Sequence, residues 1–231
     1  MLTLQITRGL VPVSSVDASF MIDSTTGYIR LNKFSTQTYK EFMTALTELN
    51  SKGLQKLILD LRDNGGGVLD EAIEIADEFL DGDKLITYTE GKHYPRKEYR
   101  CRRNGIFEKG KLVVLCNYGT ASASEVLMGA LQDWDRATIV GKRSFGKGLV
   151  QEQYDLSDNG ALRLTIARYY TPTGRSIQRP YENGGKAYYD EIEERAYQNN
   201  NASDSLYSKG KIYTSPSGKK LFGGGGIMPD T

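Results

Sequence analysis

Two periods in the spacing of the apolar residues predict an alternation of strands and helices. Strands are predicted where apolar residues alternate with polar ones or form short runs: Leu2–Arg8, Val16–Ile22, Tyr28–Leu31, Lys56–Leu61, Leu85–Thr89, Leu112–Cys116, Thr138–Val140, Leu149–Tyr154 and Leu162–Tyr170. Helices are predicted where apolar residues line one helical face, and with a weaker signal near the C-terminus: Thr36–Leu49, Leu69–Leu80, the segment from Ser122 to about Asp133, and Ala187–Gln198. This order predicts an α/β domain with a mostly parallel central sheet flanked by helices.

Turn residues separate these elements. Asn159-Gly160 favours a tight hairpin between the two last predicted strands. The polar stretch Glu90–Lys109 is typical of a further, solvated hairpin, and Asn199–Asp204 of a loop. Gly223–Gly226 is too rich in glycine for a regular element.

Composition excludes several classes of protein. The 231 residues are 39% hydrophobic and 26% charged, which fits one large or two small globular domains. A net charge of +1 gives no global attraction to nucleic acid or to an anionic membrane, and no stretch approaches the ~18 apolar residues of a membrane span. The two cysteines, Cys101 and Cys116, exclude a disulfide framework and have no metal-ligand spacing, so we expect free thiols.

Ser122 is a candidate nucleophile with a competing structural role. It lies among small residues at the start of a predicted helix, where free backbone N–H groups can stabilise an oxyanion. The same tetrapeptide, Ser122 to Glu125, satisfies the S-x-x-E pattern of a capping box, so Ser122 could simply cap the helix. Capping and catalysis could also be divided between Ser122 and Ser124.

Lys147 is a candidate general base. Gly146 and Gly148 flank it and Phe145 is nearby, which favours a tight, partly dry site. A buried lysine can lose its proton and then accept one from a serine hydroxyl, and this chemistry suits a chain whose single histidine, His93, lies in a charged stretch. The alternatives are a solvated lysine or a phosphate-binding loop, but Gly148 stands where that loop needs serine or threonine, and a strand follows instead of a helix.

A loop and a strand residue become candidates for the same site once Ser122 and Lys147 are considered together. Asp63–Gly67 lies between a buried strand and a helix, and its N–H groups could face a developing negative charge, although by itself it is a flexible turn. Gln151 lies four residues after Lys147, on the same face of the predicted strand, where it could hold the lysine amine.

Together, seven motifs resemble those of the carboxy-terminal processing peptidases, the tail-specific protease family, over roughly residues 8 to 230. They occur in the family's order: Gly27–Leu31, Leu57–Gly67, Ala121–Glu125, Leu131–Asp133, Val140–Gln151, Arg168–Arg175 and Gly225–Asp230. The residues of these motifs are most similar to those of the family's Bacteroidetes members. The fold implied is an α/β sandwich with a crotonase-like or ClpP-like core and a cap region of helix and strand.

The resemblance implies a serine endopeptidase that cleaves proteins near their C-termini without metal or cofactor. Ser122 would be the nucleophile, Lys147 the general base and Gln151 its assistant, with the backbones of Gly66 and Ala123 forming the oxyanion hole. Substrates would be proteins or peptides bound in extended form. The setting implied is extracytoplasmic, periplasmic in Gram-negative bacteria.

The chain departs from the family pattern at its ends. Members usually carry a PDZ domain before the first matching strand, and we expect residues 1–231 to be a single catalytic core that lacks it, truncated at both ends. A non-catalytic module that binds peptides or apolar ligands on the same fold is the second hypothesis. An esterase or amidase acting on small molecules is a third. The oligomeric state is not predicted.

Overall fold

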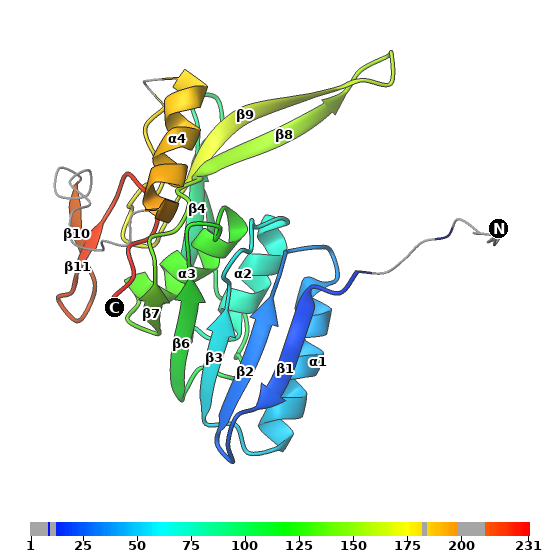
Figure 1. Cartoon of the computed structure of the whole chain (residues 1–231), viewed down its shortest axis with the longest axis vertical. Coiled ribbons are helices and arrows are strands. Elements are labelled where there is room, and N and C mark those ends of the chain that lie inside the picture. The colour runs from blue at the N-terminus through cyan, green and yellow to red at the C-terminus, as the bar shows by residue number, and fades with distance from the viewer. Residues whose placement is uncertain (1–8, 10–12, 182–183, 198–210) are drawn as a thin grey trace.

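The computed structural model describes residues 9, 13–181, 184–197 and 211–231 (Figure 1). Its strands are β1 (Val16–Met21), β2 (Thr26–Leu31), β3 (Lys56–Asp60), β4 (Leu85–Glu90), β5 (Lys97–Arg100), β6 (Lys111–Cys116), β7 (Thr138–Gly141), β8 (Leu149–Asp155), β9 (Ala161–Tyr170), β10 (Ile212–Thr214) and β11 (Lys220–Phe222). Its helices are α1 (Thr38–Ser51), α2 (Leu69–Asp77), α3 (Ala123–Asp133) and α4 (Gly184–Tyr197).

A five-stranded sheet in the order β1-β2-β3-β6-β7 forms the centre of the fold. The last four strands of this order run parallel, and β1 pairs antiparallel with β2. Alternate residues on one face of the sheet, such as Leu57, Leu59 and Val114, are buried in one core with apolar residues of α1, α2 and α3. This arrangement confirms the predicted fold class.

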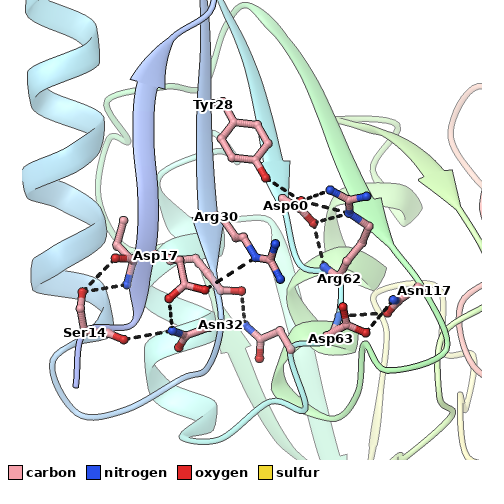
Figure 2. A network of polar contacts seen from close by, with 12 residues as sticks. Ser14, Asp17, Tyr28, Arg30, Asn32, Asp60, Arg62, Asp63 and Asn117 are labelled. Atoms are coloured by element: carbon pink, nitrogen blue, oxygen red, sulfur yellow. Dashed lines mark hydrogen bonds and ion pairs between the residues drawn. The ribbon is translucent and has the colours of Figure 1, made fainter.

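The loops that follow β3 and β6 lie together at the carboxyl end of the parallel strands, where α/β sheets place their binding sites. In Figure 2, Asp63 and Asn117 join these loops: Asp63 N–H donates to Asn117 Oδ1 over 2.9 Å, and the Asn117 amide donates to Asp63 Oδ1 over 2.8 Å. At the end of β3, the buried Asp60 carboxylate accepts hydrogen bonds from Arg62 and Tyr28. The glycine-rich loop after β3 is therefore held beside the segment that leads to α3.

A second, four-stranded antiparallel sheet has the order β5-β4-β9-β8. Of the polar stretch Glu90–Lys109, where a hairpin was predicted, β5 alone forms a complete strand, and it pairs with the preceding strand β4. The predicted Asn-Gly hairpin joins β8 and β9, with Asn159 at a φ of 63° and a hydrogen bond of 2.8 Å from Leu156 N–H to Gly160 O. Figure 1 shows this hairpin extending well beyond the rest of the fold, and β8 forms the edge of its sheet.

The C-terminal elements were only partly predictable. The helix expected at Ala187–Gln198 is found as α4, whereas β10 and β11 form an antiparallel pair that the pattern did not indicate. Gly223–Gly226 is irregular, as expected. The predicted strand Leu2–Arg8 and the predicted loop Asn199–Asp204 lie outside the described residues.

A buried ion pair fastens the turn after β9 to the end of α3. Arg175 is fully buried, and its guanidinium lies 2.6 Å from the Asp133 carboxylate at the last residue of the helix. Thr173 donates to the same carboxylate through its N–H and its hydroxyl, over 2.9 and 2.7 Å. Asp133 thus ends the helix, as predicted, and also positions the segment that follows β9.

Candidate active site

Ser122 lies at the start of α3 in a backbone conformation that side-chain-bearing residues rarely adopt. Its φ is 58° and its ψ is −117°, a positive φ that favours glycine. Backbone strain of this kind is concentrated at functional sites. The serine is partly exposed, and its N–H donates to Glu125 Oε2 over 2.8 Å. The Glu125 side chain therefore accepts the backbone N–H of the N-cap residue, as the S-x-x-E pattern of a capping box predicted.

Ser124 has a structural role that separates it from Ser122. It is fully buried, and its hydroxyl donates to the Asn64 carbonyl over 3.0 Å. Asn64, also fully buried, accepts the Ala121 N–H on the same carbonyl, and its side-chain amide donates to Leu31 O. Asn64 thus fixes the glycine-rich loop against the start of α3, and of the two serines Ser122 is the one that is partly exposed.

The backbone around Gly66 approaches the serine closely. A β-carbon added at Gly66 would lie 2.8 Å from Ala123 N and 2.8 Å from Ser122 Cβ, so only glycine fits. Within the described residues, no hydrogen bond occupies Ala123 N–H, whereas Gly66 N–H donates to Asn64 Oδ1 over 2.9 Å. Ala123 offers a free donor beside the serine, and the donor role of Gly66 stays a prediction.

One buried carboxylate joins the serine segment to the lysine segment. Glu125 Oε2 accepts the N–H of Ser122 and that of Lys147, over 2.8 and 2.9 Å, and Oε1 accepts Gly146 N–H over 2.7 Å and the Ser144 hydroxyl over 2.5 Å. Complete burial raises the pKa of Glu125, while these four donors oppose the increase because they stabilise the charged form. The backbone N–H groups of Ser122 and Lys147 thus share one acceptor, the Oε2 atom of Glu125.

Tyr169 on β9 lies near both segments. Its buried hydroxyl donates to the Lys147 carbonyl, and the nearby Ser122 side chain acts to lower the pKa of the phenol. Burial, aided by the nearby Glu125 carboxylate, raises the pKa of Tyr169, so the phenol stays protonated. The residue lies between Ser122 and the backbone that carries Lys147.

A cavity of about 1230 Å³ opens at this point, and its lining includes two of the predicted site residues but not Ser122, Gly66 or Ala123. Lys147 and Gln151 line it beside Gly65 and Ala121, the residues next to Gly66 and Ser122. Lys147 is partly buried and Gln151 is exposed. In the part of the chain that the structure describes, no hydrogen bond joins the lysine amine to the Ser122 hydroxyl, so the dyad is not formed in this conformation.

The described residues contain no group of three or more His, Cys, Asp or Glu side chains that could hold a metal ion. Cys101 and Cys116 are both buried free thiols, as expected, and burial raises the pKa of each to about 12. Among the described helices, none has the length and hydropathy that a membrane span requires.

Three residues of the site were not predicted from the sequence. The S-x-x-E pattern gave Glu125 only a capping role, although it also binds residues about 20 positions further along the chain. Asn64 lay in a segment interpreted as a loop, and Tyr169 in a strand, with no local signal that would have assigned either to the site. The roles of Glu125, Asn64 and Tyr169 depend on contacts with segments that are distant in the sequence.

Comparison with known proteins shows the family to which the chain is related. The sequence model of peptidase family S41 matches residues 25–185. Over 181 residues, 77% of the chain, it is 40% identical to a carboxy-terminal-processing protease of Bartonella bacilliformis, and over 178 residues, 75% of the chain, 43% identical to a carboxyl-terminal-processing protease of Synechocystis. The chain spans 41% of the length of each of these relatives.

A solved structure supports the same relationship. The photosystem II D1 C-terminal processing protease superposes with a TM-score of 0.65 at 38% sequence identity. The match covers 76% of this chain and 48% of that protein. The similarity therefore extends to the fold as well as to the sequence.

Proposed function

Because the chain belongs to peptidase family S41, we propose that it is a serine endopeptidase that cleaves protein substrates near their C-termini. Ser122 is the nucleophile, Lys147 the general base and Gln151 the residue that orients the lysine amine. The observation that carries this assignment is the shared Glu125 carboxylate, which accepts the backbone N–H groups of Ser122 and Lys147 on one oxygen, beside the cavity that Lys147 lines. The proposed setting is extracytoplasmic.

In the proposed reaction, the neutral Lys147 amine takes the proton of the Ser122 hydroxyl as the serine oxygen attacks the peptide carbonyl. The negative charge on the carbonyl oxygen is stabilised by the free Ala123 N–H, with the Gly66 region as the second donor. The C–N bond then breaks, and the lysine ammonium returns the proton to the leaving amine. A water molecule, activated by the same amine, hydrolyses the ester that remains on Ser122.

The peptide binds in extended form along β8. Among the described strands, β8 is an edge of its sheet, and it begins two residues after Lys147 and contains Gln151, so its outer backbone groups can accept an added strand. Backbone pairing of this kind tolerates varied side chains, as cleavage of diverse protein tails requires.

The test compares the chain with its Ser122→Ala variant, using peptide hydrolysis and labelling by a fluorophosphonate probe. We expect the variant to lose labelling and roughly four to six orders of magnitude in rate, at a cost in stability of about 1 kcal/mol or less. Hydrolysis should persist in EDTA, because the proposed reaction uses no metal ion. Full activity in Ser122→Ala, or peptide binding without any hydrolysis by the parent chain, would refute the proposal.

A further inference from the structure

The wall of the active-site cavity is basic. Of the described residues that line it, three are cationic, namely Lys147, Arg168 and Arg179, and none is an aspartate or a glutamate. A peptide that enters this cavity meets only positive side-chain charges. The charge of the wall therefore favours anionic groups of the peptide and disfavours lysine and arginine side chains.

Two of these three side chains, Arg179 and Lys147, already have another role. Arg179 is 4% exposed, pairs with Glu191, and lies with its guanidinium carbon 3.9 Å from the centre of the Tyr188 ring. Lys147 must be neutral when it acts as the base in the proposed reaction. Arg168 is then the cation that the cavity wall offers to a ligand.

Arg168 is placed and exposed as such a role requires. It lies on β9 directly opposite Leu149 of β8, and Leu149 and Gln151 line the same cavity. Its side chain is exposed, and within the described residues no ion pair or hydrogen bond engages its guanidinium. Glu90 is opposite it on β4, but their charged atoms are not within ion-pair distance.

The other arginines near the site differ from Arg168 in this respect. Arg143 is ion-paired with Glu191, and the buried Arg175 is ion-paired with Asp133. An arginine that is exposed and unengaged at the mouth of a substrate cavity retains its planar set of donors for a ligand. A carboxylate matches that set, because guanidinium and carboxylate can form two parallel hydrogen bonds.

We infer that Arg168 binds a carboxylate of the peptide substrate and makes the core itself selective for acidic or free-ended peptides. The inference rests on the proposed function, since it assigns a specificity to the same cavity. The carboxylate comes either from an acidic side chain or from the C-terminus of the peptide. In both cases recognition of the substrate resides within this chain, on the strand beside the catalytic lysine.

The test measures binding to the Ser122→Ala form of the chain, so that no peptide is consumed. The probe is a short fluorescent peptide of alanine and valine with one aspartate and a free C-terminus. It is compared with its amidated form, its Asp→Asn form and the form in which both charges are removed. We expect the loss of the recognised carboxylate to weaken binding roughly tenfold to a hundredfold, and the form that shows the loss identifies the source.

Three substitutions make the test specific. Arg168→Gln should remove the discrimination between charged and neutralised peptides, whereas Arg163→Gln should retain it. Arg163 is an exposed arginine on the same strand, bonded to Gln153 in the hairpin and outside the cavity lining. Glu90→Gln should leave the discrimination intact, which separates carboxylate binding from a cross-strand role of Arg168 in the sheet.

The outcomes separate this inference from the proposed function. Equal binding of all four peptide forms, or discrimination that survives Arg168→Gln, overturns the inference even when Ser122-dependent hydrolysis is present. Discrimination that depends on Arg168 supports the inference even when the parent chain hydrolyses none of the peptides, a result that refutes only the proposed function. In an active chain, kcat/KM should show the same order of preference as binding.

Discussion

The Glu125 carboxylate is the contact whose loss should most affect both stability and catalysis. Its two oxygens accept four hydrogen bonds, two from the Ser122 and Lys147 backbones and two from Gly146 and the Ser144 hydroxyl. Glu125→Gln keeps the shape of the side chain but replaces one oxygen by an NH₂ group. If the NH₂ group takes the place of Oε2, the N–H groups of Ser122 and Lys147 face a donor. If it takes the place of Oε1, Gly146 N–H faces a donor, while the Ser144 hydroxyl can turn to accept from it.

The expected cost follows from the one or two bonds lost. A hydrogen bond to a charged group contributes about 1.5–3 kcal/mol to stability, so the substitution should cost about 1.5–6 kcal/mol. For a chain of this size, that loss lowers Tm by roughly 3–24 °C. The lysine segment also loses the anchor that aligns it with Ser122, and a displacement of about 1 Å at a catalytic group can cost roughly a hundredfold in rate.

Thermal unfolding followed by circular dichroism gives the stability, and peptide hydrolysis at a temperature where the variant is folded gives kcat/KM. Glu78→Gln is the matched control. Glu78 is 2% exposed and accepts hydrogen bonds from Tyr39, Arg103 and Ile106 N–H, but it lies outside the cavity. It should lose a similar amount of stability and keep its activity.

Two results would contradict this reasoning about Glu125. One is a Glu125→Gln variant with the Tm and activity of the parent chain, which would mean that water replaces the carboxylate at no cost. The other is an equal loss of activity in Glu125→Gln and Glu78→Gln after correction for the unfolded fraction. That equality would reduce the role of Glu125 to general stability.

Two further substitutions test the hydrogen bond from Tyr169 to the Lys147 carbonyl and the ion pair between Arg175 and Asp133. Tyr169→Phe removes the hydroxyl that bonds the Lys147 carbonyl, so it should cost about 1–2 kcal/mol of stability; activity measured on the folded variant should fall, and an unchanged kcat/KM would exclude a positioning role. Asp133→Asn leaves the buried Arg175 charge without its partner, so urea unfolding should show a loss of about 3–5 kcal/mol. In that variant kcat/KM of the folded fraction should be retained, and a stability equal to that of the parent chain would show that the ion pair contributes nothing net.

Much of the fold follows from local pattern. The apolar run of β3 and the one-sided apolar faces of α1 and α2 identified these elements to within a few residues, because each buries its own face. The three-residue strands β10 and β11 were missed, since a pattern of period two needs more positions to be recognised. Elements that depend on pairing for stability have the weakest local signal.

The candidate site divides in the same way. Small residues, glycines and position relative to the helix indicated Ser122 and Lys147, because reactivity imposes local requirements on sequence. The residues that hold the two together are Glu125, Asn64 and Tyr169, and each acts through contacts with segments distant in sequence. A capping box, a turn and a strand residue are common in any α/β protein. Their role in this site exists only once β3, α3 and β9 have brought the serine and lysine segments together, so it belongs to the fold and not to any one motif.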